Sequence, residues 1–313
     1  MRKSPRIVIT GAAGLVGQNL LVRLQGLGYT RLAGIDKHRA NTAILRRLHP
    51  DIEIIEADLA TAGPWETLLQ PGDALVIAHA QIGGTAAEPF QANNIIATRN
   101  LLQVAVRAGV AHIVHISSSV VNSAARDHYT ETKKAQEALV AECAIPHVIL
   151  RPTLMFGWFD RKHLGWLARL MRRSPIFPIP GDGRFRRQPL YAGDFCAIVA
   201  DCIATGRSGE AHNISGRTVI DYIDLIRAVR VAARARTAIL RIPFSVFHVL
   251  LRTYALFDAD PPFTTRQLAA LALPELFEVI DWPAIFNVAP TPLAAALAQT
   301  FQVRPYCDIE LQF

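Results

Sequence analysis

Three side chains that can share one proton-transfer reaction lie close together in the sequence. Ser118 ends an apolar, β-branched run, and Tyr129 and Lys133 follow it in a helix-like segment, four residues apart. At that spacing the phenol and the ammonium group share one helix face. A phenol titrates near pH 10, and a neighbouring positive charge favours its anion, so the pair can exchange a proton with a substrate. An i, i+4 Tyr/Lys pair is also a common feature of surface helices, so the surrounding elements must decide between the two interpretations.

Those elements alternate strictly through the first half of the chain. Apolar β-like runs predict strands at 6–10, 31–36, 52–58, 74–80, 112–118 and 147–152. Helical spacing of apolar residues predicts helices at 14–28, 42–49, 89–109 and 130–144. Such alternation is typical of a parallel sheet that is covered on both faces. We therefore expect an α/β fold with a doubly wound, Rossmann-type sheet.

The pattern changes after Pro152, where Gly, Pro, Arg and aromatic residues become frequent. A helix at 192–206, a strand at 211–216 and a helix at 218–235 follow. We expect a nucleotide-binding domain over 1–152 with return segments at about 188–216. Residues 153–187 and 217–313 would form a smaller, discontinuous lobe for the substrate.

The segment 238–257 is strongly apolar, but Arg241, Pro243 and Arg252 interrupt it before the length that a bilayer span needs. A core or interface helix is the first expectation. The alternative is a helix that makes a peripheral contact with a membrane or with a second subunit.

Composition narrows the class of protein. The chain has 313 residues, 51% of them hydrophobic, so we expect a globular protein. Its four cysteines have neither metal-like nor disulfide-like spacing, which predicts no metal site and suits the reducing cytoplasm. We also expect no signal peptide. The formal net charge is +7, and much of the basic excess lies between residues 161 and 187. This cluster indicates an anionic partner, but no nucleic-acid-binding motif accompanies it.

The glycine pattern after the first predicted strand changes the interpretation of the Tyr/Lys pair. Gly11, Gly14 and Gly17 open a helix, as a loop that binds a pyrophosphate does. Asp36 ends the next strand, where a carboxylate accepts hydrogen bonds from the ribose hydroxyls and repels a 2′-phosphate. NAD is therefore favoured, and the basic residues that follow, Lys37, His38 and Arg39, keep NADP as the less favoured alternative. Asp58 is either a partner of the adenine amino group or an ordinary loop acid.

Taken together, these motifs resemble an extended short-chain dehydrogenase/reductase of the NAD-dependent nucleotide-sugar epimerase/dehydratase group. The resemblance runs from residue 6 to about 216 and includes the glycine loop, "ADL" at 57–59, "NNIIATRNLL" at 93–102, "ISSS" at 116–119, the Tyr129/Lys133 pair and "RPTLMFG" at 151–157. "GDGRFRRQPLYAGDF" at 181–195 resembles the loop of that group that precedes a helix-opening Asp.

The resemblance implies roles for individual residues. Tyr129 would be the acid/base, Ser118 would orient the same substrate oxygen, and Lys133 would hold the cofactor ribose and lower the pKa of Tyr129. Ser119 and Arg187 would contact the substrate, with Arg187 on the nucleotide diphosphate. The cofactor site would comprise Gly11, Ala13, Gly14, Leu15, Val16, Gly17, Asp36, Lys37, Asp58, Leu59, Ala78, Ala80, Asn94, Ile116, Lys133, Pro152 and Thr153.

Departures from the group's pattern concern the substrate. Ser119 and Val120 stand where the 4,6-dehydratases need a general acid and a second carboxylate, so dehydration is disfavoured and 4-epimerisation or 4-keto reduction remains. Leu154 replaces a substrate-binding Asn, and only 11 residues separate Ser118 from Tyr129. A ketone/alcohol dehydrogenase for a lipid-like or lipid-linked substrate is therefore an alternative, and a non-catalytic dinucleotide-binding subunit is another.

Two further expectations concern packing. His79 and Ser117 are expected to be structural, His79 as a buried, hydrogen-bonded histidine and Ser117 because it lies on the opposite strand face from Ser118. The segments 89–108 and 131–144 are apolar on more than one face. This pattern predicts a homodimer through a four-helix bundle, which the resemblance also implies.

Overall fold

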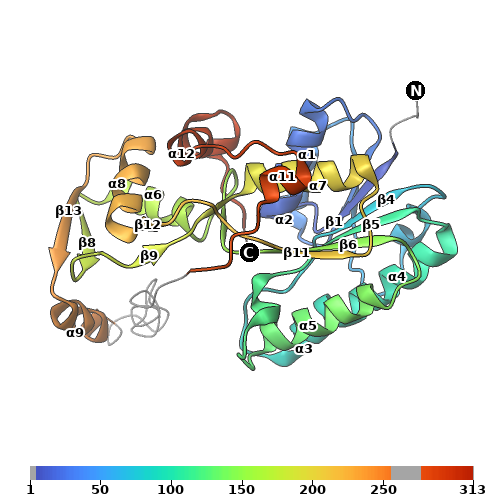
Figure 1. The fold of residues 1–313 in the computed structure, drawn as a ribbon, viewed down its shortest axis with the longest axis horizontal. Helices are drawn as coiled ribbons and strands as arrows, with labels where there is room; N and C mark the ends of the chain where they lie inside the picture. Colours follow the sequence, from blue (N-terminus) through green and yellow to red (C-terminus); the bar gives the residue numbers. More distant parts are fainter. Residues whose placement is uncertain (1–4, 255–275, 313) are drawn as a thin grey trace.

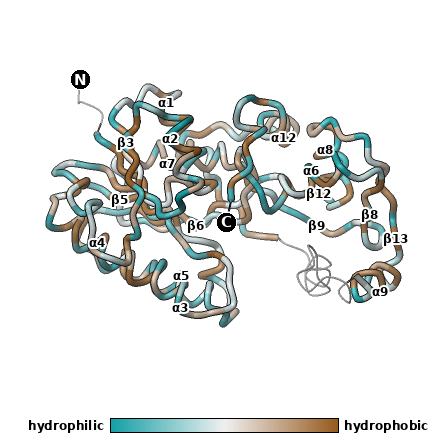
Figure 2. The backbone as a smooth tube through the Cα atoms, turned by 180° about the vertical axis from the view of Figure 1, so that it is seen from behind, coloured by the Kyte–Doolittle hydropathy of each residue, from teal (hydrophilic) through white to brown (hydrophobic). Residues whose placement is uncertain are grey.

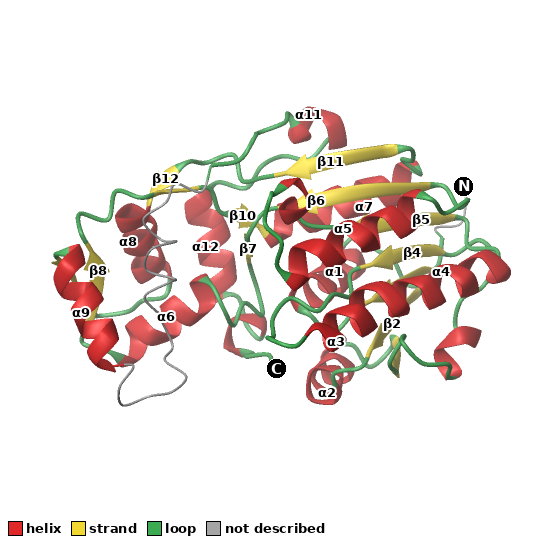
Figure 3. Ribbon diagram, turned by 90° about the horizontal axis from the view of Figure 1, so that it is seen from below, coloured by secondary structure: helices red, strands yellow, loops and turns green. Residues whose placement is uncertain are grey.

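The computed structural model describes residues 5–254 and 276–312 and shows an elongated molecule of two parts (Figure 1). One part is a sheet between two layers of helices. The other is a smaller C-terminal lobe of short strands and helices, and Figure 3 shows both parts side by side along the long axis.

The larger part is built on one parallel sheet with the strand order β11-β6-β5-β4-β1-β2-β3. Its members are β1 (Ile7–Thr10), β2 (Leu32–Asp36), β3 (Glu53–Glu56), β4 (Ala74–Ile77), β5 (His112–Ile116), β6 (His147–Pro152) and β11 (Glu210–Ile214). All seven strands predicted for this part are confirmed, as is the Rossmann-type class. The chain reverses its direction across the sheet between β1 and β4, so a crevice opens at the carboxyl ends of these strands.

Both faces of the sheet are buried. Ile7 and Ile9 point into one hydrophobic core, and Val8 between them points into the other. This arrangement explains why the strands appear in the sequence as unbroken apolar runs rather than as alternating patterns.

Helices from distant parts of the sequence cover the two faces (Figure 1). The core on one face is filled by α1 (Leu15–Gly26), α2 (Arg39–Leu48), α7 (Ala192–Thr205) and α11 (Trp282–Phe286). The other face packs against a 3₁₀ turn (Pro64–Thr67), α4 (Ala97–Ala108) and α5 (His128–Ala141).

The predicted helix at 89–109 is interrupted. A short α3 (Ala87–Phe90) leads through a π-helical segment (Gln91–Ile96) into α4. Such π-helical turns often mark functional sites, and this one carries Asn94 toward the carboxyl edge of the sheet.

The C-terminal lobe has its own core, in which Phe156, Met171, Phe177 and Ile226 are buried. Its strands pair as β7 (Met155–Phe156) with β10 (Leu190–Tyr191), β8 (Ile176–Pro180) with β13 (Ala238–Ile242), and β9 (Arg186–Arg187) with β12 (Ile220–Asp221). Its helices are α6 (Leu164–Arg173), α8 (Tyr222–Ala232), α9 (Phe244–Tyr254) and α12 (Leu293–Gln302).

The structure corrects the expectation of a single core helix over 238–257, whereas a contact with a second subunit stays a prediction. Residues 238–242 form strand β13, and Pro243 separates it from α9. None of the described side chains of α9 is buried, and Figure 2 shows this largely hydrophobic helix at the far end of the lobe. Residues 255–257 lie outside the described part of the chain.

The end of the chain returns to the sheet. Trp282 of α11 is buried in the sheet's core, where its indole N–H donates to the carbonyl of Ser215 over 3.0 Å. Gln312 and Asn41 exchange two hydrogen bonds of 2.8 and 2.9 Å. These contacts join the two parts, and the sequence pattern does not reveal them.

Within residues 5–254 and 276–312, no helix combines the length and the apolar character required to cross a bilayer. Ile96, at the end of the π-helical segment, and Val106 of α4 are exposed in the single chain. The homodimer through α4 and α5 stays a prediction.

Candidate active site

The loop between β1 and α1 packs so closely against neighbouring backbone that two of its positions require glycine. Gly11 has a φ of +65°, and a Cβ on it would lie 2.7 Å from the carbonyl carbon of Ala78. A Cβ on Gly17 would lie 2.4 Å from the carbonyl oxygen of Gly11. Helix α1 has no side-chain N-cap and no acidic residue in its first turn. Its positive end therefore fits a pyrophosphate.

Asp36 lies beside this loop at the end of β2. Its carboxylate accepts hydrogen bonds from the backbone N–H of Ala13 at 2.9 Å and of His38 at 2.8 Å. Burial raises the pKa of Asp36, and these N–H groups oppose the rise. Lys37 donates to Asp58 at 3.1 Å, and His38 caps α2. Lys37 and His38 therefore have partners within the protein, whereas Arg39 is exposed.

Other expected cofactor residues line the carboxyl ends of the strands. Ala78 and Ala80 follow β4, Ile116 ends β5 and Pro152 ends β6. Thr153 follows, and its hydroxyl is buried without a hydrogen-bond partner. A buried polar group of this kind calls for a partner, so this orphaned hydroxyl fits a polar group of the cofactor.

Two expected cofactor residues also have structural roles. Asp58 accepts a hydrogen bond from Ala60 N at 2.9 Å, which agrees with the loop-acid interpretation. Asn94 is fully buried, accepts from Gln81 N at 2.6 Å and donates to Thr132 at 2.9 Å. The Asn94 amide thus joins the loop after β4 to α5, and its direct contact with the cofactor stays a prediction.

The structure brings Ser118 and Tyr129 together. Ser118 begins a 3₁₀ turn (Ser119–Asn122), and its hydroxyl oxygen accepts from Val120 N at 3.4 Å. Tyr129 is the second residue of α5, which Asp127 caps. The Ser118 hydroxyl lies close enough to the Tyr129 phenol to act on its pKa. A serine and a phenol are therefore in place to contact one substrate oxygen.

Burial is the largest influence on the pKa of Tyr129 in this geometry, and the expected effect of Lys133 on it stays a prediction. Burial raises the pKa of Tyr129 above its usual value, and the Ser118 hydroxyl opposes this rise only in part. The Lys133 ammonium donates to the carbonyl of Ile116 at 3.1 Å and to the Gln136 Oε1 at 2.5 Å. Burial lowers the pKa of Lys133 to about 7, whereas Glu137 acts to raise it.

Ser117 has the structural role that its strand position predicts. Its hydroxyl donates to Glu137 at 2.6 Å, and the Arg151 Nε donates to the same carboxylate at 3.0 and 3.1 Å. A buried carboxylate needs such partners. This ion pair joins α5 to β6 behind the Ser118/Tyr129 pair.

His79 is hydrogen-bonded, as expected, but it is partly buried rather than fully buried. Its ring nitrogens contact Thr10 Oγ1 at 2.8 Å and Thr98 Oγ1 at 3.0 Å. Gln136, which the sequence analysis overlooked, donates to Thr98 at 2.9 Å. The available signal was its position one helical turn after Lys133, on the same helix face.

Arg187 belongs to the C-terminal lobe rather than to the sheet. It is buried in β9, donates to the carbonyl of Arg186 at 2.8 Å, and lies 5.9 Å from the ring centre of Tyr222. Arg184 and Arg186 are largely exposed beside Asp221. The structure therefore distinguishes buried Arg187 from its exposed basic neighbours.

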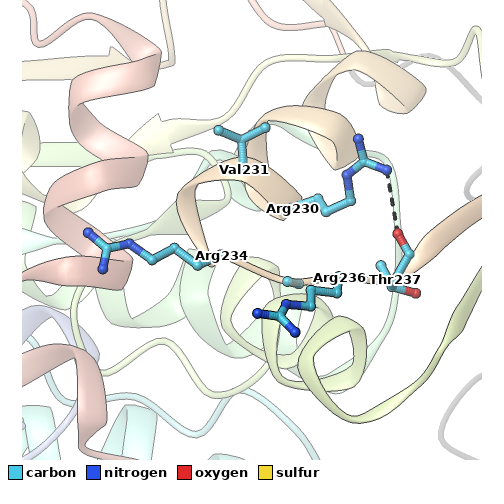
Figure 4. Close-up of a pocket in the computed structure, with 6 residues that line it drawn as sticks. Arg230, Val231, Arg234, Arg236 and Thr237 are labelled. Atoms are coloured by element: carbon cyan, nitrogen blue, oxygen red, sulfur yellow. Dashed lines mark hydrogen bonds between the residues drawn. The ribbon is translucent and has the colours of Figure 1, made fainter.

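Two surface hollows lie outside this site. One of about 550 Å³ is bordered by Arg230, Arg234, Arg236 and Thr237 at the end of α8, and Figure 4 shows its guanidinium groups pointing apart. Another of about 270 Å³ lies between α6 and the chain end, next to Arg169. Neither hollow is lined by a residue of the Ser118/Tyr129 site.

In the described residues, no group of three or more His, Cys, Asp or Glu side chains is placed to hold a metal ion.

A parallel Rossmann sheet, a glycine loop and a Ser/Tyr/Lys set at the carboxyl edge define a dinucleotide-binding protein of the short-chain dehydrogenase/reductase type. The chain belongs to the NAD dependent epimerase/dehydratase family, whose model matches residues 7–215. NAD is therefore the cofactor to which the loop and Asp36 correspond.

Individual relatives differ in what they act on. The chain is 25% identical over 244 residues to a dTDP-glucose 4,6-dehydratase of Actinoplanes sp., covering 67% of this chain and 76% of that protein. It is 25% identical over 270 residues to a 3 beta-hydroxysteroid dehydrogenase/Delta 5-->4-isomerase of Mycobacterium tuberculosis, covering 76% and 72%. The structure of a UDP-glucuronic acid 4-epimerase from Bacillus cereus in complex with NAD superposes with a TM-score of 0.72 at 22% identity, covering 96% of this chain and 98% of that one.

Gly17→Ala tests the close packing of the loop. We expect a loss of about 1–3 kcal/mol of unfolding free energy, because the new methyl group would overlap the Gly11 carbonyl. Gly26→Ala in the same helix is the control, because the added Cβ meets nothing within 4 Å. This substitution should raise the free energy of unfolding by about 0.4–1 kcal/mol. Urea denaturation measures both, and equal stabilities of the two variants would contradict the packing described.

Proposed function

We propose that this chain transfers a hydride between NAD(H) and C4 of a nucleotide-diphosphate sugar, as a 4-epimerase or a 4-keto reductase. The observation that carries the proposal is the placement of Ser118, at the end of β5, beside Tyr129 at the start of α5, with Lys133 one helical turn further on. The names of two relatives, a UDP-glucuronic acid 4-epimerase and a dTDP-glucose 4,6-dehydratase, support this substrate class.

The residues would move protons as follows. In the reducing direction the Tyr129 O–H donates its proton to the oxygen that forms at C4, and the Ser118 hydroxyl holds that oxygen. The raised pKa of Tyr129 suits this donor role because it keeps the phenol protonated at neutral pH. In the oxidising direction a Tyr129 phenolate accepts the C4 hydroxyl proton, and the Lys133 ammonium would favour that anion. NAD(H), when bound, supplies or receives the hydride.

Ser119 and Val120 argue against dehydration. They are the first two residues of the 3₁₀ turn after Ser118, and both are partly exposed. Neither side chain can add or remove a proton at neutral pH, as elimination of water from a 4-keto sugar requires. Ser119 is proposed to contact the sugar instead.

Arg187 is proposed to hold the diphosphate. A guanidinium can engage two phosphate oxygens at once. Its contact with the Tyr222 ring limits the directions that its side chain can take.

Tyr129→Phe tests the chemical assignment. We expect turnover to fall about 10²–10⁴-fold, because the variant keeps the ring and loses the transferred proton. The rate would be measured with UDP-glucuronic acid and a panel of UDP- and dTDP-hexoses, and the same assay of Tyr29→Phe controls for loss of an unrelated phenol. Full turnover of Tyr129→Phe would contradict the mechanism, and tight NADH binding without turnover in the wild type would favour the non-catalytic subunit.

A lipid-like or lipid-linked substrate is our second candidate. Leu154, next to the orphaned Thr153 hydroxyl, is 48% exposed. On α9, Val246, Val249 and Leu250 are exposed at helical spacing. Residues 238–254 contain two arginines and no acidic residue, so this surface is complementary to an anionic membrane. The steroid-converting relative supports an apolar substrate.

The double change Val249→Glu and Leu250→Glu tests the membrane contact. We expect binding to phosphatidylglycerol vesicles to weaken at least about tenfold, because the change removes apolar area and adds like charge. Leu27→Glu, which alters an exposed leucine in the Rossmann part, is the control and should bind as the wild type does. Co-sedimentation measures binding, and wild-type protein that stays in the supernatant would rule out the contact.

A further inference from the structure

A buried chain of hydrogen bonds connects Lys133 to the first strand of the sheet. Four fully or nearly fully buried polar side chains form its links, namely Thr10, Thr98, Lys133 and Gln136. His79 lies between the two threonines. Each bond in this chain has a direction that the neighbouring bond determines.

One set of bond directions satisfies every partner in this chain. In it the Thr10 hydroxyl donates to the carbonyl of Val76 at 3.3 Å. The Thr10 oxygen then accepts from the Nδ1–H of His79 at 2.8 Å. In a neutral imidazole this leaves Nε2 as an acceptor. The Thr98 hydroxyl therefore donates to His79 Nε2 at 3.0 Å.

The neighbouring groups also determine which way round the side-chain amide of Gln136 lies. The Thr98 oxygen, having donated its own proton, accepts from the Gln136 Nε2–H at 2.9 Å. That amide N–H₂ also donates to the carbonyl of His79 at 3.3 Å. The amide oxygen of Gln136 must then face the Lys133 ammonium, 2.5 Å away. A reversed amide would place N–H₂ against the ammonium and lose these bonds.

We propose that Gln136 is a positioning residue, whose amide, oriented by Thr98 and His79, keeps Lys133 protonated and in place for the cofactor. The inference rests on the proposed role of Lys133 as the residue that holds the cofactor ribose. Nothing in the glycine, Ser118 or Tyr129 motifs assigns a function to Gln136.

The electrostatic surroundings of Lys133 agree with this role. Glu137 approaches from the same helix and raises the pKa of Lys133. His115 on β5 and His79 after β4 face it from the sheet, and burial together with the Lys133 charge lowers the pKa of both. The pKa of His79 falls to about 3, so its ring is neutral at physiological pH, as the bond directions require.

The experiment measures NADH affinity by fluorescence from pH 6 to 10. If the Lys133 ammonium donates to the cofactor, affinity falls as pH rises through the pKa of Lys133. Lys133→Met should remove this dependence. We call the pH at which half of this affinity change has occurred the midpoint. Gln136→Leu removes the amide oxygen that accepts from Lys133 and should move the midpoint to lower pH, because a buried ammonium with fewer acceptors releases its proton more readily. Gln136→Glu places a carboxylate beside it and should move the midpoint to higher pH.

Two further variants separate positioning from folding. Thr98→Val removes the bond that orients the amide, and it should shift the midpoint in the same direction as Gln136→Leu. Gln103→Leu changes an exposed glutamine of α4 and should keep the wild-type midpoint. Near-UV circular dichroism checks that each variant is folded.

Opposite shifts of at least half a pH unit for Gln136→Leu and Gln136→Glu would support the inference. If Gln136→Leu does not fold, an upward shift in Gln136→Glu alone supports it. Unchanged midpoints, shifts in the same direction, or a midpoint that persists in Lys133→Met would overturn it. Because the readout is NADH binding, an inactive protein with these shifts would refute only the proposed sugar chemistry.

Discussion

A buried ammonium group is the constraint around which this site is organised. Lys133 is 1% exposed, and a cation in such surroundings is costly unless hydrogen-bond acceptors replace its water. The fold supplies two acceptors, the carbonyl of Ile116 at the end of β5 and the amide of Gln136. Burial lowers the pKa of Lys133 to about 7, so its charge depends on these few contacts. The Ser118/Tyr129 pair lies where the same strand and helix meet.

The Rossmann sheet explains why these groups converge. The strands are parallel, so their carboxyl ends share one edge, and the reversal between β1 and β4 leaves a crevice there. Gly11 to Gly17 bring backbone N–H groups to this edge, and β5 brings Ser118. Behind it, the Glu137–Arg151 ion pair ties α5 to β6. One edge of the sheet thus positions both the proposed cofactor contacts and the proposed proton donor.

Much of this could be predicted from the sequence, because its signals are local. Strands buried on both faces appear as apolar runs, and the glycine loop and the Ser118, Tyr129 and Lys133 set occupy fixed offsets from them. What could not be predicted depends on contacts between distant residues. The Lys133 ammonium points toward its acceptors on Gln136 and Ile116 rather than toward Tyr129. The strand β13 depends on pairing with β8, some 60 residues away in the sequence, and the apolar character of 238–257 did not distinguish strand from helix.

The two proposed substrate classes would contact different parts of the C-terminal lobe, a nucleotide diphosphate at Arg187 and a lipid at helix α9. Hydride transfer at C4 of a nucleotide sugar is the central claim, and isotope transfer tests it most directly. The protein with bound NAD would be incubated with UDP- and dTDP-hexoses that carry deuterium at C4, and the nicotinamide would be analysed by mass spectrometry. In samples quenched during turnover, we predict reduced nicotinamide about one mass unit heavier than NADH, because one deuteride moves to the cofactor before an epimerase returns it to the sugar. Quenched samples that contain no deuterated reduced nicotinamide with any sugar of the panel would contradict the claim.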